Sequence, residues 1–300
     1  MRNAALHYFL EVARSGSLSR ASEKLHIAPS AISRQIAKLE EEVGAQLFER
    51  LPTGMVLSAA GEVLATHAMR ANLEQERILA EIQELSSEGG SLISVASTEG
   101  VARNFLPHVM STFREAYPKT RFALNVAIPS IVIGMIKGGD VDLGITFSTK
   151  PSEGVRIEYS ARSQIHALMH RRHPLSKRKS LMLADLQGYP MALKEEGSTQ
   201  RQLVDLCCQL EGLVLNLVLT CNDSGSLQQF VFYSGAIALT SKVSEQYSLQ
   251  KGDLISIPLL NAELCQRNVQ VLTMAARILP INVRRFVDLV AARMAVTSLN

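Results

Sequence analysis

The chain has 300 residues, of which 47% are hydrophobic and 20% charged, and its net charge is +3. That length predicts two or three globular domains, and the small positive charge allows a nucleic-acid partner without requiring one. The four cysteines form no CxxC pair and have no histidine at metal-ligand spacing, which argues against a zinc site and a disulfide framework, and we expect no cofactor. No apolar run reaches the roughly 18 residues of a membrane span, and the N-terminus lacks the apolar core of a signal peptide, so we expect a cytoplasmic protein.

Three helices are predicted before Gly44. Apolar residues recur at helical spacing over residues 3–15. A short helix follows Ser17, whose hydroxyl we expect to cap it. A third helix opens at Pro29, where a missing N–H is tolerated, and ends at about Val43.

The third predicted helix has two chemically different faces. Its apolar stripe packs against the first two helices, whereas its polar side offers hydroxyls, an amide, a guanidinium and an ammonium that suit base edges and phosphates. The polar residues are Ser30, Ser33, Arg34, Gln35 and Lys38. For this helix taken alone, an ordinary solvated face is the competing interpretation.

The segments SGSLSRASEKLHIAPSAISRQIAKLEEEVGAQLFER at 15–50 and PTGMVLSAAGE at 52–62 resemble the DNA-binding domain of LysR-type transcriptional regulators. The likeness is carried by Ser17, Ala21, Leu25, Ser33, Ile36, Leu39, Glu40, Gly44, Leu47, Phe48, Arg50 and Gly61. It implies a winged helix-turn-helix over residues 1–57 that binds double-stranded DNA, with Arg50 and Thr53 on a wing beside the phosphate backbone. Ala28 and Pro29 depart from the family's usual residues, which leaves base contacts near that end of the helix open.

A long linker helix is predicted from Ser58 to about residue 86. Its heptad seam is formed by Leu64, Ala68, Ala71, Gln75, Ile78, Ile82 and Leu85. At 1.5 Å per residue the helix is roughly 43 Å long, too long to bury its seam on a sixty-residue domain, so a second copy is the expected partner. Packing on the chain's own C-terminal domain is the alternative. The resemblance implies a homodimer or a dimer of dimers, hence a homotetramer, and allows contact with RNA polymerase.

From residue 91 onward, strand-like and helix-like segments alternate, which predicts an α/β domain with parallel strands. The motifs LPHVMSTFREAYP at 106–118, KGGDVDLGI at 137–145 and YSGAIAL at 233–239 resemble the LysR effector domain, a two-lobed fold like type 2 periplasmic binding proteins. We therefore expect an α+β multi-domain chain. Its parts are the DNA-binding domain at 1–57, the linker helix and hinge at 58–88, and an effector domain at 89–300, with lobe I at about 91–161 and 268–300 and lobe II at about 162–267.

Polar residues at strand ends and helix starts are the effector-binding candidates: Ser97, Thr98, Ser130, Phe147, Ser148, Ser198, Thr199 and Asn222. Hydroxyls at helix N-termini suit a carboxylate, although each one alone is more typical of an ordinary helix cap. Glu99 would oppose an anion, so an effector that carries an amine stays open.

The sequence thus predicts a sequence-specific transcriptional regulator controlled by a small-molecule effector, and not an enzyme. The alternative is a cytoplasmic small-molecule-binding protein or an enzyme on a two-lobed α/β domain, but no nucleophile and base pair or glycine-rich phosphate loop is evident. Peroxide sensors of the family carry a reactive cysteine where this chain has Thr199, so Cys207 and Cys208 are expected to be packed hydrophobes. His166, His170 and His173 are not expected to bind a metal, and HRRHPLSKRK at 170–179 is expected to be a solvated loop.

Overall fold

The computed structural model describes residues 4–52, 54–85, 91–149, 152–245, 252–275 and 277–299. The chain divides into two compact units, residues 1–85 and 86–300. The first unit is a helical domain with a two-stranded sheet, and the second contains two five-stranded sheets. None of the helices described has the length and apolar character that a membrane crossing requires.

The first unit begins with a helix-turn-helix of α1 (Ala4–Ser15), α2 (Leu18–Leu25) and α3 (Pro29–Val43). The predicted apolar stripe of α3 is buried against α1, where the ring of Phe9 is fully enclosed. The turn after α2 passes through His26 in the left-handed region, at φ 56°, and α3 ends at Gly44 in the same region, at φ 72°. Ser17 occupies the N-cap position of α2, but its side chain makes no capping hydrogen bond, contrary to the prediction.

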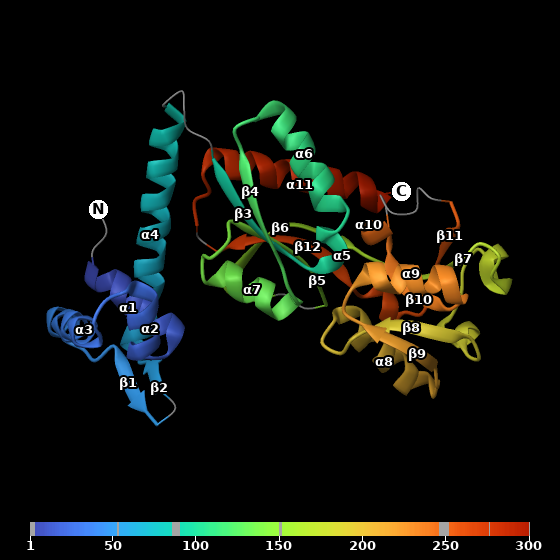
Figure 1. Ribbon diagram of the computed structural model, residues 1–300, viewed down its shortest axis with the longest axis horizontal. Helices are drawn as coiled ribbons and strands as arrows, with labels where there is room; N and C mark the ends of the chain where they lie inside the picture. Colours follow the sequence, from blue (N-terminus) through green and yellow to red (C-terminus); the bar gives the residue numbers. More distant parts are fainter. Residues whose placement is uncertain are drawn as a thin grey trace. The chain divides into compact units, whose positions relative to one another are not determined.

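A wing and a long helix complete the first unit. Strands β1 (Phe48–Leu51) and β2 (Gly54–Leu57) form an antiparallel hairpin, and α4 spans Ala59–Leu85. The backbone N–H of Gly61 donates to the Ser58 hydroxyl at 3.0 Å, which confirms the predicted helix start. The first half of α4 packs on the helix-turn-helix, and the second half extends beyond it (Figure 1).

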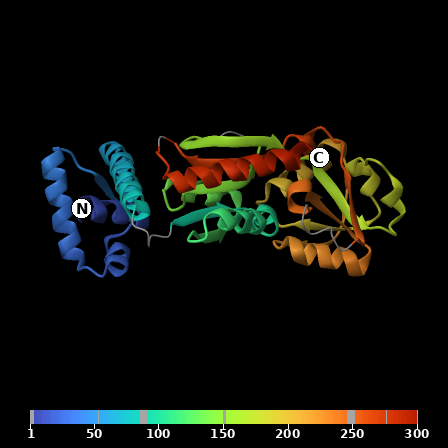
Figure 2. The same ribbon diagram turned by 90° about the horizontal axis from the view of Figure 1, so that it is seen from above.

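The first lobe of the second unit is a mixed sheet with strand order β4-β3-β5-β12-β6. Its strands are β3 (Leu92–Ser97), β4 (Arg121–Val126), β5 (Leu143–Ser148), β6 (Val155–Arg162) and β12 (Asn268–Met274). Helices α6 (Phe105–Ala116) and α11 (Ile281–Leu299) cover one face and α7 (Pro129–Lys137) the other; in Figure 2 the red helix α11 runs along the lobe. A short helix, α5 (Glu99–Ala102), follows β3 and precedes α6.

The second lobe has the strand order β11-β7-β10-β8-β9. Its strands are β7 (Ile165–His170), β8 (Pro190–Lys194), β9 (Asn216–Cys221), β10 (Ile237–Ser241) and β11 (Leu254–Pro258). Helix α8 (Thr199–Glu211) packs on one face, α9 (Ser224–Ser234) packs on the other, and the short α10 (Lys242–Glu245) follows β10. In the described connections lie the 3-10 turns η1 (Pro174–Lys177), η2 (Leu183–Leu186) and η4 (Glu263–Cys265).

Both sheets are mixed, whereas the sequence predicted parallel strands. Strands β3, β4 and β5 are parallel, as are β8, β9 and β10, but β12 runs antiparallel to β5 and β7 runs antiparallel to β10. The reason is the path of the chain. Strands β7 and β12 follow the two crossings between the lobes, so each enters its sheet from the edge at which the parallel strands end, and must run against them.

Candidate functional site

In the first unit, the polar side of α3 faces solvent. The side chains of Ser30, Arg34, Gln35 and Lys38 are exposed, and that of Ser33 is partly buried beside the wing. The Nε–H of Arg34 donates weakly to the Ser30 carbonyl at 3.4 Å, and the Lys38 ammonium lies 3.9 Å from a carboxylate oxygen of Glu42. Since exposed pairs of this kind contribute little, both cations remain available to an outside partner.

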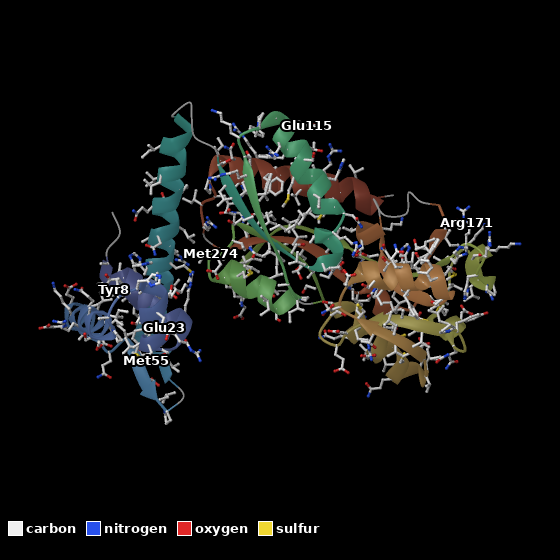
Figure 3. All side chains as sticks on the ribbon, in the orientation of Figure 1. Tyr8, Glu23, Met55, Glu115, Arg171 and Met274 are labelled. Carbon is white, nitrogen blue, oxygen red and sulfur yellow. The ribbon has the colours of Figure 1, made fainter. Side chains whose placement is uncertain are left out.

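The wing is fixed to the helix-turn-helix by its backbone. The N–H of Met55 donates to the Gly16 carbonyl at 2.9 Å, and Met55 is the second residue of the wing strand β2 (Figure 3). Arg50 lies on β1, opposite Met55 in the hairpin, but its side chain is outside the described part of the structure. Thr53, predicted at the tip of the wing, also lies outside the described residues.

The second unit contains a cavity of about 440 Å³ between its two lobes. It lies where β3, β5, β8, β9 and β10 end, the position at which open α/β sheets usually bind ligands. Its size is that of a small-molecule site. An apolar stretch from Val126 to Pro129 and the ring of Phe147 form one part of the wall, and hydroxyl, amide and charged groups from both lobes form the rest.

Polar contacts join the two lobes beside this cavity. The Lys194 ammonium of the second lobe donates to the Glu99 carboxylate of the first at 2.7 Å, and the Ser224 hydroxyl donates to the same carboxylate. A second ion pair joins Arg103 to Asp223 at 3.1 Å. The N–H of Ser226 donates to Asp223, which caps α9 and holds the pKa of that carboxyl below its ordinary value. These contacts hold the two lobes together beside the cavity.

Unpaired polar atoms gather around the cavity. Within the described residues, four buried side-chain atoms have no hydrogen-bond partner, and three of them belong to residues that line this wall. They are Thr98 Oγ1, Glu99 Oε1 and Arg267 Nη2; the fourth, Arg277 Nε, does not line the cavity. Since buried polar groups are nearly always paired, their concentration here indicates that a ligand completes the site.

Five of the eight predicted effector residues line the cavity: Thr98, Phe147, Ser198, Thr199 and Asn222. Thr199 donates its hydroxyl to the Phe147 carbonyl at 3.1 Å, and the Ser198 hydroxyl caps α8 by accepting from the Arg201 N–H. Ser97, Ser130 and Ser148 are not part of the wall. Ser97 is fully buried, and Ser130 lies inside the first turn of α7 because that helix begins at Pro129, one residue earlier than Ser130.

The prediction missed the charged part of the wall, above all Lys194 and Arg267. Lys194 is the last residue of β8, where the same strand-end reasoning that selected Phe147 could have found it. Arg267 stands just before a buried strand, and nothing in the local sequence distinguishes it from a surface arginine.

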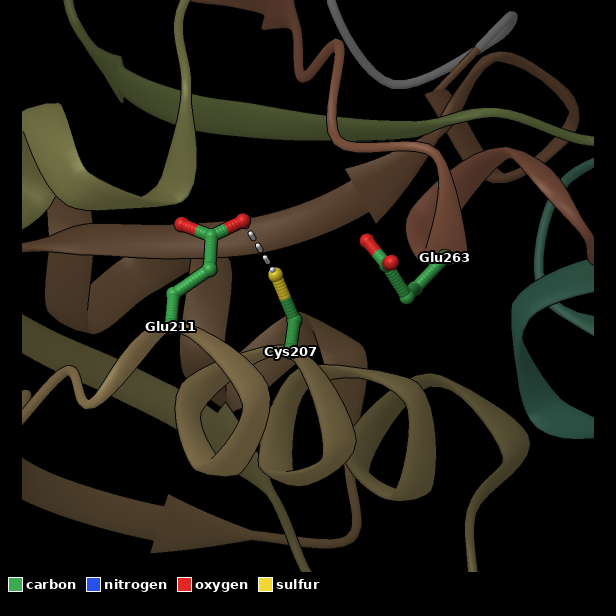
Figure 4. A group of neighbouring side chains, drawn as sticks. All are labelled: Cys207, Glu211 and Glu263. Atoms are coloured by element: carbon green, nitrogen blue, oxygen red, sulfur yellow. Dashed lines mark hydrogen bonds between the residues drawn. The ribbon is translucent and has the colours of Figure 1, made fainter.

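The buried Cys207 lies beside Glu211, which is exposed, and Glu263, which is partly buried (Figure 4). Its thiol donates to Glu211 at 3.4 Å, and burial, with that carboxylate second, raises the pKa of the thiol to about 12. The thiol is therefore protonated and unreactive at neutral pH. The amide of Asn261 donates to the same Glu211 oxygen at 2.7 Å, so the cluster fastens α8 to the segment before η4.

Two histidines of the second lobe, His166 and His173, are held within the fold, and the basic segment at 170–179 begins at the last residue of β7. His166 is buried in β7, and burial, with the charges of Lys242 and Arg267, lowers its pKa to about 4. His173 caps η1 by accepting the Leu175 N–H. In the basic segment at 170–179, Arg171 lies at the outer edge of the second lobe (Figure 3).

Two family models match the chain. The model described as "Bacterial regulatory helix-turn-helix protein, lysR family" matches residues 4–62, and the model described as "LysR substrate binding domain" matches residues 86–295. The transcriptional dual regulator GltC of Bacillus subtilis is 32% identical over 206 residues, 68% of this chain and 69% of GltC. The transcriptional activator CmpR of Synechocystis is 25% identical over 250 residues, 81% of each chain.

Solved structures share the fold. A full-length OxyR variant from Pseudomonas aeruginosa has a TM-score of 0.67 and 18% identity, covering 97% of this chain and 94% of that one. Full-length CbnR in complex with its target DNA has a TM-score of 0.56 and 20% identity, covering 97% and 99%.

Proposed function

The chain belongs to the LysR family of transcriptional regulators, and on that premise we propose that α3 enters the major groove of its operator with its exposed polar side. The protein is a DNA-binding regulator with an effector domain, and its curated relatives regulate transcription. Arg34 and Gln35 carry the donors and acceptors that base edges require, whereas Ser30 and Lys38 suit phosphates, as do Ser33 and the wing residues Arg50 and Thr53. The exposure of the α3 side chains supports this assignment.

We further propose that α4 pairs two copies of the chain, so that two α3 helices read half-sites a fixed distance apart. The apolar side chains of Ile78, Leu79 and Ile82, in the second half of α4, are 44% to 57% exposed. A helix end with three such side chains is unusual in a monomer and fits a helix-helix seam. The assembly is a homodimer or a homotetramer made of two dimers, working in the cytoplasm.

The cavity between the lobes is our proposed effector site. The observation that carries this assignment is the presence, in one cavity wall, of three buried polar atoms without a hydrogen-bond partner. A small organic molecule, a carboxylate among the candidates, would accept hydrogen bonds from Arg267 and Thr98 and would contact both lobes, so its binding depends on how closed the lobes are. Regulation then follows from a difference in effector affinity between open and closed forms.

The DNA assignment is tested with the full chain on duplex DNA from its own gene neighbourhood. Footprinting should reveal paired half-sites about one helical turn apart or a multiple of that distance, and sedimentation should give a dimer or larger assembly. Protein that sediments as a monomer and ignores duplex DNA at low salt would overturn this assignment.

The effector assignment is tested with a panel of small metabolites in thermal-shift and footprinting assays. A compound that raises the melting temperature should also change the footprint. Ala127→Trp, which fills the cavity, should abolish both effects, whereas Leu124→Trp on the same edge of the sheet but outside the wall should abolish neither. An unchanged footprint with every stabilising compound contradicts effector control.

A further inference from the structure

Arg267 is a buried arginine without an acidic partner. It lies in the second crossing between the lobes, just before β12, and only 3% of its surface is exposed, yet it lines the cavity. Its Nε–H donates to the Ser163 carbonyl at 3.3 Å, while its Nη2 is buried and has no hydrogen-bond partner. Across the described residues, no carboxylate forms an ion pair with it.

Arg277 provides the contrast within the same chain. Its guanidinium is buried to a similar degree, but its Nη2 pairs with the Asp142 carboxylate at 2.7 Å and its Nη1 donates to the Val141 carbonyl at 3.3 Å. Arg277 does not line the cavity. The buried arginine that lies away from the cavity, Arg277, thus has a carboxylate partner, whereas Arg267, which faces the cavity, has none.

A buried charge without a counter-charge destabilises a fold, so its presence calls for a compensating role. The ring of Phe147 lies 4.2 Å below the Arg267 guanidinium and offsets part of the desolvation through a cation-π contact. Burial lowers the pKa of Arg267 only to about 9, and the group keeps its positive charge at neutral pH. The cavity therefore contains a permanent cation whose donors are incompletely used.

We propose that Arg267 anchors the acidic group of a singly charged organic carboxylate with an apolar body. This inference rests on the effector function proposed above. A carboxylate matches the planar fork of a guanidinium, and the unpaired Thr98 hydroxyl in the same wall supplies a further donor. The Phe147 ring and the stretch from Val126 to Pro129 provide the surface for a hydrocarbon group.

The other charges of the wall select the ligand's charge. Among the described residues, the wall has four acidic members, Glu99, Glu195, Glu196 and Asp223, and two basic ones, Lys194 and Arg267. Lys194 is already paired with Glu99. In the part of the wall that the structure describes, one available cation faces an excess of carboxylates, which suits a monoanion and disfavours inorganic phosphate or a dicarboxylate, whose second charge would meet like charge.

Two variants of the full chain separate this role from a structural one. If Arg267 serves a ligand, Arg267→Met removes an uncompensated charge and the ligand-free protein should melt at the same temperature as wild type or higher. Arg277→Met, the matched control, removes the partner of Asp142 and should melt at a lower temperature. An Arg267→Met protein that melts below wild type, or fails to fold, overturns the proposal, because it identifies Arg267 as a packing residue.

Ligand selectivity gives the second readout. Thermal shifts are measured with benzoate, phenylacetate and 4-methylpentanoate, with the amide of each, and with inorganic phosphate. At least one carboxylate should stabilise wild type, its amide and phosphate should not, Arg267→Met should lose the shift, and Arg267→Lys should keep part of it. Equal shifts with carboxylate and amide that persist in Arg267→Met overturn the anion site but leave the effector cavity in place. If no carboxylate stabilises the protein, the proposed anion site at Arg267 is also overturned. The footprinting with metabolites does not depend on Arg267 and then tests the proposed effector function separately.

Discussion

A single methyl group added at Gly61 should weaken the packing of α4 on the helix-turn-helix. A Cβ at this position would lie 2.1 Å from the carbonyl oxygen of Leu47 and 3.0 Å from a methyl carbon of Leu57. The Leu47 carbonyl cannot move easily, since it accepts the Ser58 N–H at 3.0 Å and the Leu47 side chain is fully buried in the core of the unit. Gly61→Ala must therefore push the start of α4 outward by about 1 Å to restore an ordinary contact.

The magnitude follows from three contributions. Overpacking a rigid site costs about 1 to 3 kcal/mol, and weakening the hydrogen bond between Ser58 and Leu47 costs about 1 kcal/mol more. Alanine returns about 1 kcal/mol through its higher helix propensity. The net loss is about 1 to 3 kcal/mol, which for a unit of this size lowers the melting temperature by roughly 5 to 20 °C.

Calorimetry of the full chain measures this change, and hydrogen exchange assigns it to residues 4–85. Gly134→Ala is the matched control, because Gly134 is also inside a helix but a Cβ there would meet nothing within 4 Å. The control should be neutral or stabilising by up to about 1 kcal/mol. If Gly61→Ala is tolerated as well as Gly134→Ala, the close approach of α4 to Leu47 does not set the position of the helix.

Two further predictions concern DNA and pH. Arg34→Ala should weaken operator binding by about 1 to 3 kcal/mol with little effect on binding to random DNA. Lys38→Ala should weaken binding to operator and random DNA alike and reduce the slope of log affinity against log salt concentration by about one. Fluorescence anisotropy over a salt series measures both variants, and an equal loss of affinity by Arg34→Ala on all sequences would show that Arg34 contacts a phosphate. Because burial lowers the pKa of His166 to about 4, the unfolded chain binds a proton between pH 6.5 and 4 that the folded chain does not. Stability should therefore fall by up to about 3 kcal/mol as pH drops through that window, and His166→Gln should flatten this part of the urea-denaturation profile.

The sequence predicted the DNA-binding unit well because its signals are local. Pro29 and Gly44 mark the two ends of α3 through their backbone chemistry. The Ser58 hydroxyl caps the start of α4 by accepting a hydrogen bond from Gly61, three residues later. The heptad seam was a less complete guide. Ala68 is buried, whereas Ile78 and Ile82 are exposed, so the residues of the predicted seam do not share one environment.

The cavity was predictable only in part, for a physical reason. Thr98, Phe147 and Thr199 stand at strand ends and helix starts, positions that topology places at the ends of the parallel strands in the two sheets. Arg267 is significant through what surrounds it in three dimensions, the Phe147 ring and the missing carboxylate, and neither is a sequence neighbour that a local pattern would reveal. The same holds for Glu99 and Lys194, which meet across 95 residues of chain.

The position of Arg267 also indicates how a bound anion would be felt by the whole effector domain. The two segments that cross between the lobes are bonded to each other: the Ser163 N–H donates to the Arg267 carbonyl at 2.8 Å, and Arg267 Nε donates back to the Ser163 carbonyl. A ligand anion bound to the Arg267 guanidinium therefore acts at the two crossing segments, about which the lobes would close. The ion pairs of Glu99 with Lys194 and of Arg103 with Asp223 stabilise closure beside the same cavity. A ligand shifts the equilibrium between open and closed lobes only by the difference in its affinity for the two forms. A ligand anchored at Arg267 and contacting walls from both lobes would have such a difference, because opening the lobes would remove part of its contacts.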